Sequence, residues 1–339
     1  MEGPVLVTGG TGVVGTALVR RLVAEGVAVR GLARSASSAT ALADLGATPL
    51  RGDVLDPASL RAAAAGCDVV FHAAGRSGLC LPDADAMDRL NVGGTATVLR
   101  AAAAAGVRRV VHTSSAATLG EVRGALADER TAHRGTFLSR YERSKRRAEE
   151  VAFALGRELG LEVVAVNPAS VQGPGRSGGS ARVLLDAVAG RLPFLVDTWL
   201  SLVDVEDCAT GHVLAARRGV AGERYVLCGA SLRAREAIDL LRDVWGAPDR
   251  VRWIPRALAV ALLVPAGAAG SLASRGAGRR TRICRESVAT LLHGHRYDGG
   301  RAARDLGLDY APLPDTLRRT LAWCAERGLV PPARPRASD

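Results

Sequence analysis

The feature that most constrains the fold is a short apolar run that ends in glycines near the start of the chain. Residues 4–8 read Pro-Val-Leu-Val-Thr, and three glycines follow before a stretch with apolar residues at helical spacing. Such a run is typical of a buried parallel strand. Glycines at a strand–helix junction permit a tight turn, close backbone approach to a pyrophosphate and close helix packing. The pattern predicts a nucleotide-binding loop that contains Gly9, Thr11, Gly12, Val13, Val14 and Gly15.

The same alternation of apolar run and helical stretch continues along the chain. Repeated strand–helix units are typical of a doubly wound parallel sheet with helices on both faces. The sequence therefore predicts an α/β fold of the Rossmann type. Further strands are expected at 27–33, 47–51, 68–74, 107–113, 161–167 and 223–228.

The alternation weakens after residue 172, where a glycine-rich loop at 173–179 begins. Residues 231–330 carry five prolines and are expected to form a smaller, mainly helical lobe over the carboxyl edge of the sheet, where ligands bind in such folds. We predict a nucleotide-binding domain formed by residues 1–172 and about 202–230. Residues 173–201 and 231–330 are predicted to form a substrate-binding lobe, and residues 331–339 a disordered tail.

The basic composition is almost entirely arginine. The chain has 45 lysines and arginines, of which only Lys145 is a lysine, and its only asparagines are Asn91 and Asn167. Arginine is a flat, permanently charged fork, whereas lysine is a compact ammonium with a tunable pKa. A lysine that persists in such a background is therefore expected to have a role that arginine cannot fill.

The bulk properties limit the partners and the location. The net charge is +11, but the arginines are spread along the chain and only twelve aromatic residues are available for stacking, so nucleic-acid binding is not expected.

The six scattered cysteines form no CxxC pair, which predicts reduced, cytosolic thiols. The first strand begins by residue 4, which leaves no room for a signal peptide. We expect a cytoplasmic protein. The sequence leaves open whether it forms a homodimer.

One uncharged segment stands apart. Residues 257–273 carry no charge, and five arginines follow between 275 and 285. A membrane-spanning helix needs about 20 apolar residues, whereas this run is shorter and is interrupted by Pro265. A buried lid or pocket helix is the favoured interpretation, and peripheral contact with a membrane is the alternative.

The end of the second predicted strand indicates which nucleotide binds. Versions that bind NAD place an acidic residue there to hold the ribose 2′-hydroxyl. This chain has Arg34 instead, and an arginine can hold a 2′-phosphate through charge-assisted hydrogen bonds. The sequence therefore favours NADP (as NADPH) over NAD. Further cofactor contacts are expected where later strands end, from Asp53, Val54, Ala73, Ala74, Asn91 and Thr113.

Three side chains make up the candidate catalytic group. Ser115 follows the strand at 107–113, and Tyr141 and Lys145 lie one turn apart on a predicted helix. An ammonium beside a phenol favours the phenolate, and lowering a pKa of about 10 towards 7 takes about 4 kcal/mol. Tyr141 is then expected to give or take the proton of an alcohol while Ser115 hydrogen-bonds the same oxygen.

With these motifs in view, the chain resembles an extended short-chain dehydrogenase/reductase of the epimerase/dehydratase superfamily over nearly its whole length. Segments that resemble the dihydroflavonol-reductase-like branch, which includes the hopanoid-associated sugar epimerases, are TSSAATLG, VDTWLSLVDVEDCATGHVLA and GERYVLCG; 3β-hydroxysteroid dehydrogenases are near relatives. The resemblance implies a Ser115–Tyr141–Lys145 triad. It also implies that Arg34, Asp53, Pro168 and Val171 surround the cofactor, to which Tyr141 and Lys145 are expected to contribute as well.

Departures from the family pattern narrow the activity. Sugar dehydratases follow the active-site hydroxyl with an Asp-Glu pair, whereas this chain has Ala116 and Ala117, so dehydration is not expected. The prediction is an NADP-dependent oxidoreductase that interconverts a ketone and a secondary alcohol by hydride transfer, in secondary or lipid/terpenoid metabolism. An NAD(P)-dependent sugar epimerase and a non-catalytic NADP-sensing regulator remain the alternatives. Epimerases usually use NAD, which Arg34 argues against.

Two remaining clusters receive structural interpretations. His293 and His295 could be half of a metal site, but no carboxylate or cysteine pattern completes it, so no metal is expected. Asp204, Glu206 and Asp207 are expected to cap a helix N-terminus rather than to act as general bases. The expected partner is a small-molecule substrate.

Overall fold

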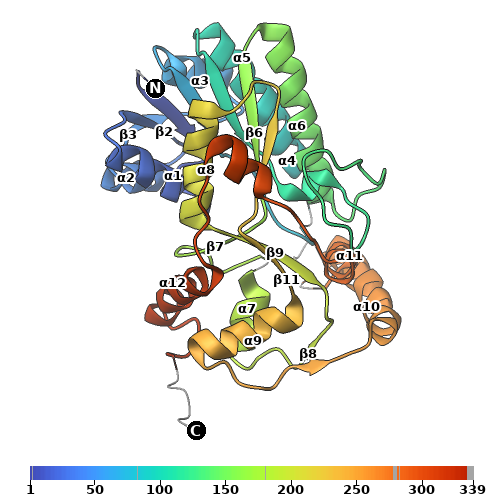
Figure 1. Cartoon of the computed structure of the whole chain (residues 1–339). Coiled ribbons are helices and arrows are strands. Elements are labelled where there is room, and N and C mark those ends of the chain that lie inside the picture. Colours follow the sequence, from blue (N-terminus) through green and yellow to red (C-terminus); the bar gives the residue numbers. More distant parts are fainter. Residues whose placement is uncertain (2, 82, 180, 278–280, 282, 334–339) are drawn as a thin grey trace.

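A computed structural model of the chain describes all residues except 2, 82, 180, 278–280, 282 and 334–339. The protein consists of a sheet domain and a smaller lobe below it in Figure 1. Most of the expected C-terminal tail, 331–339, lies outside the described residues.

The sheet domain contains seven parallel strands in the order β10-β6-β5-β4-β1-β2-β3. This arrangement confirms the predicted doubly wound sheet, because successive strands are added on one side from β1 to β3 and on the other side from β4 onward, as in dinucleotide-binding folds. Each of the seven predicted strands is present, with its ends within two residues of the expected limits. Their bounds are β1 Val5–Thr8, β2 Val29–Ala33, β3 Thr48–Arg51, β4 Val69–His72, β5 Arg109–Thr113, β6 Glu162–Pro168 and β10 Arg224–Leu227.

Helices cover both faces of the sheet (Figure 1). One face packs in a core with Leu18 and Leu42, on helices of the first two strand–helix units, and with Val213 of a later helix. The other face packs in a separate core that contains Leu60, Leu99 and Leu155. The helices of the first face are α1 Val13–Ala24, α2 Ala36–Asp44 and α8 Val205–Arg218, and those of the second are α3 Pro57–Ala64, α5 Gly94–Ala104 and α6 Arg140–Leu159.

The smaller lobe has its own core, which includes Leu185, Ile238 and Leu321. Four helices build it with short strands: α7 Ala181–Val188, α9 Ala234–Trp245, α11 Arg285–His293 and α12 Leu313–Glu326. The lobe is mainly helical, as predicted, and two short sheets also contribute to it. These are β11-β9-β7 and β12-β8, formed by β7 Ser170–Gln172, β8 Phe194–Leu195, β9 Trp199–Asp204, β11 Ala230–Arg233 and β12 Arg252–Trp253.

The uncharged segment forms most of α10, Arg256–Ala277. Only 11% of its window Arg256–Ala273 is buried, so the expected buried lid or pocket helix is wrong. It is the one helix among the described residues that is long and apolar enough, by length and composition alone, to cross a membrane. The sequence could not distinguish these cases, because buried and lipid-facing helices share an apolar composition.

The cysteines also depart from expectation. Cys80 and Cys284, which are 204 residues apart in sequence, form a disulfide, while Cys67, Cys208, Cys228 and Cys324 are free and buried. The prediction that all six are reduced thiols was therefore wrong for one pair. Sequence spacing could not reveal it, because the two residues meet only when the lobe packs on the sheet domain.

Candidate active site

The glycine loop joins β1 to α1 with almost no space to spare. Gly9 adopts a φ of +72°, and a Cβ on it would lie 2.6 Å from the backbone nitrogen of Ala74. A Cβ on Gly15 would lie 2.1 Å from the carbonyl oxygen of Gly9. Both positions therefore exclude any other residue, and the start of α1 packs directly on the loop.

The first turn of α1 is open to an anion. Its N-cap, Gly12, has no side chain to satisfy the backbone N–H groups, and the first turn has no acidic residue. A Cβ on Gly12 would meet only the Gly9 carbonyl, at 3.3 Å, so this side of the loop is accessible. A groove of about 250 Å³ runs here between Thr11–Val13 and the loop residues Pro174 and Gly175. Free N–H groups and the helix dipole suit a pyrophosphate at this place.

The second strand ends without a carboxylate. Arg34 follows β2 directly and is exposed, and Ser35 accepts from the Ser38 backbone N–H to begin α2. Beyond β3, one carboxylate oxygen of Asp53 accepts from the Leu55 N–H at 2.9 Å and so shapes the turn before Val54. Arg34 and Asp53 therefore lie at the same edge of the sheet as the glycine loop.

His72 is a packed histidine at the end of β4. Its ring lies between the hydroxyls of Thr8 and Thr95, at 2.8 and 3.0 Å. Burial lowers the pKa of His72 to about 3, with a smaller contribution from the charge of Lys145. His72 therefore stays neutral and supports the turn into Ala73 and Ala74.

Asn91 has a structural role beside the site. Its side chain accepts from the N–H of Arg76 at 2.7 Å and donates to the carbonyl of Arg76 and to the hydroxyl of Ser144. Asn91 thus ties the loop after β4 to α6, the helix that carries Tyr141 and Lys145.

The three candidate catalytic side chains meet at the carboxyl end of β5. Ser139 caps α6 by accepting from the Glu142 N–H, which fixes the start of the helix at Arg140. The side chains of Tyr141 and Ser115 lie close together, since Ser115 acts to lower the pKa of the Tyr141 phenol. The structure therefore brings together a serine and a tyrosine that are 26 residues apart in the sequence.

Lys145 lies behind this pair. It is 6% exposed, and its Nζ donates to the backbone carbonyl of Thr113 at 2.6 Å. Burial lowers its pKa to about 8, although the carboxylate of Glu149 opposes this shift. A lysine amine so close to neutrality changes charge within an accessible pH range.

The expected lowering of the Tyr141 pKa was wrong for this structure. Burial raises the pKa of Tyr141 above its ordinary value and outweighs the effects of Ser115 and of the charge of Arg176, both of which lower it. Lys145 is not among these influences, because its amino group is directed to the Thr113 carbonyl. The phenol therefore holds its proton.

Arg176 is a site residue that the sequence analysis missed. It lies in the loop after β7, half-buried, close enough to Tyr141 for its charge to act on the phenol. Burial lowers the pKa of Arg176, and its Nε has no hydrogen-bond partner among the described residues. One more arginine in a chain with so many gave no distinguishing signal.

The other expected cofactor residues lie at the same edge. Thr113 ends β5 beside Val166 of β6, and its hydroxyl pairs with His212 at 2.8 Å. Pro168 ends β6, and Val171 lies in β7. These residues, together with the glycine loop, surround one open edge of the sheet.

The acidic residues of α8 behave as predicted. Asp204 is its N-cap and accepts from the Glu206 N–H at 2.7 Å. Asp207 accepts from the Ala311 N–H, and burial raises its pKa to about 6. Asp204 therefore caps α8, and Asp207 holds the segment that leads into α12.

A carboxylate, that of Glu121, lies beside both His293 and His295. Glu121, which is 1% exposed, lies with one oxygen 2.7 Å from His295 Nδ1 and 3.3 Å from His293 Nε2. The expectation that no carboxylate completes this group was wrong, since Glu121 is 174 residues away in sequence. The donor set is of a kind that can hold Zn²⁺. Here the neighbouring His293 and His295 lower the pKa of Glu121 to about 2, against burial, and the hydrogen bond between Glu121 and His295 ties the lobe to the sheet domain.

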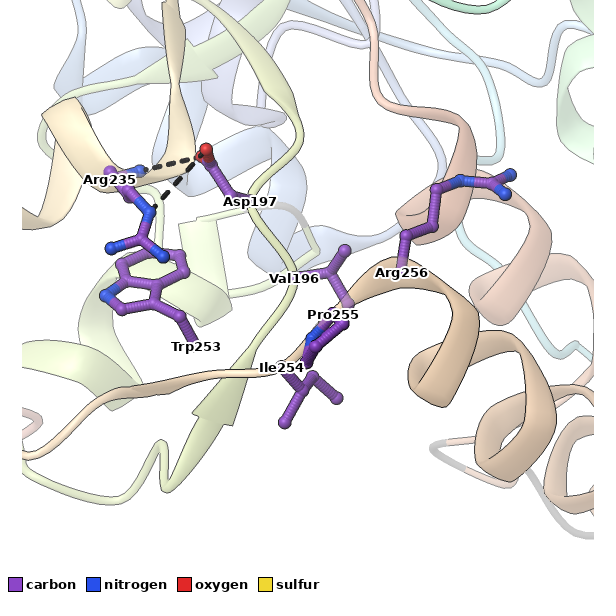
Figure 2. Close-up of a pocket in the computed structure, with 7 residues that line it drawn as sticks. All are labelled: Val196, Asp197, Arg235, Trp253, Ile254, Pro255 and Arg256. Atoms are coloured by element: carbon purple, nitrogen blue, oxygen red, sulfur yellow. Dashed lines mark hydrogen bonds and ion pairs between the residues drawn. The ribbon is translucent and has the colours of Figure 1, made fainter.

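A second hollow lies in the smaller lobe. Figure 2 shows it between the start of α10 and Trp253, with Arg235 stacked over the indole at 4.6 Å and paired with Asp197. Its lining shares no residue with the catalytic group. Its residues are Val196, Asp197, Arg235, Trp253, Ile254, Pro255 and Arg256.

Comparison with known proteins agrees with this geometry. The NAD dependent epimerase/dehydratase family matches residues 5–228, which include the whole sheet domain. The chain belongs to this family, and so to the extended short-chain dehydrogenases/reductases.

Three relatives of similar sequence are named as two reductases and a sterol demethylase protein. A putative dihydroflavonol 4-reductase of Synechocystis is 32% identical over 96% of this chain and 95% of its own length. Sterol demethylase protein B of Methylococcus capsulatus is 34% identical over 96% and 99%. A 4-hydroxy-2-methyl-3-oxo-4-farnesyl-3,4-dihydroquinoline-1-oxide ketoreductase of Stigmatella aurantiaca is 35% identical over 74% and 75%.

The similarity extends to solved structures. The crystal structure of gox2253 is 32% identical, covers 96% of this chain and 99% of its own, and has a TM-score of 0.83. Together with the glycine loop, this makes the protein an NAD(P)-dependent oxidoreductase by family.

Proposed function

We propose that the protein reduces a ketone to a secondary alcohol with NADPH, with Ser115, Tyr141 and Lys145 as its catalytic group. The observation that carries the proposal is the closeness of the Tyr141 and Ser115 side chains at the end of β5, where the Lys145 Nζ also donates to the Thr113 carbonyl. Two hydroxyls held together in this way can both reach one carbonyl oxygen. Bound NADPH supplies the hydride.

The raised pKa of Tyr141 supports the reductive direction. A ketone that receives a hydride becomes an alkoxide-like oxygen and must gain a proton. A phenol kept protonated by burial is ready to donate that proton, while the Ser115 hydroxyl donates a hydrogen bond to the same oxygen. Lys145 holds the end of β5 through its hydrogen bond to the Thr113 carbonyl. Its amino group is positively charged below about pH 8.

Cofactor choice rests on Arg34. Its exposed guanidinium stands at the end of β2, where a carboxylate would otherwise hold a ribose 2′-hydroxyl. A guanidinium there would instead hold a 2′-phosphate through paired hydrogen bonds. The proposal is therefore NADPH rather than NADH.

For the substrate we propose an apolar ketone of the lipid or terpenoid type. The support is the names of two relatives, one a sterol demethylase protein and the other a ketoreductase of a farnesyl-bearing compound. A sugar epimerase remains the second candidate, since the family includes epimerases. A non-catalytic NADP sensor is the third, and the presence of both Tyr141 and Lys145 argues against it.

Cofactor turnover separates these candidates. With an apolar ketone such as a sterone, the purified protein should consume NADPH stoichiometrically with alcohol formed, which is followed by the loss of absorbance and by product chromatography. An epimerase would convert its substrate without net NADPH consumption and would retain its cofactor through purification. A sensor would bind NADPH and do neither.

A further inference from the structure

Helix α10 is an apolar helix that the rest of the described protein leaves uncovered. It spans 22 residues, and the window Arg256–Ala273 has a mean hydropathy of 1.6 with 11% of it buried. A core helix of this composition would be largely enclosed. Five of the thirteen exposed large hydrophobic side chains of the described residues lie on it or just after it: Leu258, Leu262, Val264, Leu272 and Ile283.

One face of α10 is already occupied. Ala259 is fully buried, and a Cβ on Gly267 would lie 2.9 Å from the Val288 side chain of α11. A Cβ on Gly270 would lie 2.0 Å from the carbonyl oxygen of Ile283. Small residues therefore let α10 lie directly against α11 and the segment that leads into it. A helix held along one side in this way leaves its other side free for a further contact.

The opposite face carries a continuous apolar stripe. Residues spaced at i, i+4, i+7, i+11 and i+14 share one side of a helix. At this spacing the exposed residues of α10 are Leu258, Leu262, Pro265, Ala269 and Leu272. An apolar stripe on one side of a helix that is anchored on the other side suits insertion parallel to a surface.

The surrounding charge indicates what kind of surface this is. Residues 250–285 contain eight arginines and no aspartate or glutamate. Arg256 at the start of α10 and Arg285 at the start of α11 are both exposed. Trp253, with Arg235 stacked over its ring, lines the hollow at the N-terminal end of the helix (Figure 2). Arginine clusters attract anionic headgroups, and tryptophan concentrates at membrane interfaces.

The α10–α11 pair is also fixed to the catalytic group. The disulfide joins Cys284, at the N-cap of α11, to Cys80 in the loop after β4. Glu286 accepts from the Cys80 N–H at 3.0 Å and from the N–H and Nε of Arg140 at 3.0 and 2.8 Å. Arg140 directly precedes Tyr141. A surface that contacts α10 is therefore held at a fixed position relative to the active site.

We propose that α10 docks the protein on an anionic phospholipid membrane, with its apolar stripe in the boundary between headgroups and acyl chains. The arginines around it contact the headgroups. The protein thus binds the membrane surface from one side, with the active site held next to it. Together with the proposed function, which this docking does not require, the arrangement lets an apolar ketone pass from the membrane to Tyr141.

Vesicle flotation of the full-length, oxidised protein tests this docking without substrate or cofactor. We expect it to float with vesicles of phosphatidylcholine mixed with phosphatidylglycerol, to float less with phosphatidylcholine alone, and to be partly released by salt. The variant with Leu258→Glu, Leu262→Glu and Leu272→Glu should bind the mixed vesicles at least tenfold more weakly. A control with Leu126→Glu, Leu159→Glu and Val220→Glu changes three exposed apolar residues elsewhere and should bind like the wild type.

Several outcomes would overturn the proposal. These are no flotation of the wild type, equal losses in the two triple variants, or equal binding to vesicles with and without phosphatidylglycerol. A wild type that is dimeric by light scattering without lipid, and an α10 variant that is monomeric, would assign the stripe to a second copy of the chain. NADPH binding by each variant checks that it is folded. Because ketone reduction is assayed separately in solution, failure of the docking and failure of the proposed function are distinguishable.

Discussion

The amino group of Lys145 donates a 2.6 Å hydrogen bond to the backbone carbonyl of Thr113. This contact ties α6 to the carboxyl end of β5, two residues before Ser115. The single lysine of the chain thus holds in place the strand end on which the proposed catalytic group is built.

Replacement of Lys145 by arginine tests why a lysine persists here. Lys145 is 6% exposed and its Nζ is already bonded to the Thr113 carbonyl, so a wider guanidinium has little space at this position. We expect Lys145→Arg to fold, to bind NADPH more weakly and to lose about 100-fold in turnover, equivalent to about 2.7 kcal/mol of transition-state stabilisation. Thermal melting measures the effect on folding, titration with NADPH measures the effect on binding, and steady-state kinetics measure the effect on turnover. Wild-type kinetics in the variant would mean that Lys145 is an incidental residue.

The lowered pKa of Lys145 predicts a pH profile for ketone reduction. The amine is positive below its pKa of about 8 and neutral above it. If the charge supports the reaction, kcat/KM falls as pH rises through about 8, because this parameter reports the free enzyme. Tyr141, whose pKa is raised, keeps its proton through this range. In Lys145→Arg the charge persists, so the residual activity should lack this fall; the same fall in both proteins would assign it to another group.

Arg34 is expected to set the preference between NADPH and NADH. The wild type should bind NADPH more tightly, and Arg34→Ala should reduce that preference at least tenfold by weakening NADPH binding alone. Arg100→Ala, which removes an exposed arginine from the middle of α5, is the matched control. Dissociation constants from fluorescence titration measure the difference. Equal affinities of the wild type for the two cofactors would remove the basis of the NADP assignment.

The disulfide is expected to stabilise the junction between the lobe and the sheet domain. Cross-links that close long loops typically contribute about 2–4 kcal/mol, and this one joins residues 204 apart. A thiol reductant should therefore lower the wild-type free energy of unfolding in urea. Cys284→Ala should be less stable from the start and insensitive to the reductant. Equal stability of oxidised and reduced wild type would contradict this role.

The sheet and the shared helix face of Tyr141 and Lys145 could be predicted because their signals are local. Each buried strand is an apolar run with its own turn, and the glycine loop has a fixed order of residues. Tyr141 and Lys145 are one helical turn apart, so their shared face follows from spacing alone.

The missed features all depend on contacts that spacing does not encode. Glu121 joins His293 and His295 only after the lobe packs on the sheet domain, and Cys80 meets Cys284 in the same way. The phenol of Tyr141 was expected to lose its proton easily because a nearby lysine was considered without the burial that opposes it. Burial is a property of the packed structure, and so the sign of that shift could not be read from the sequence.

The most direct test of the proposed reductase is Tyr141→Phe, assayed for NADPH-dependent reduction of an apolar ketone. The change removes the phenolic oxygen and leaves the ring, so the fold and NADPH binding should be retained. Because the variant has no proton donor at this position, turnover should fall by several orders of magnitude. Near-wild-type turnover by Tyr141→Phe on a ketone that the wild type reduces would contradict the account.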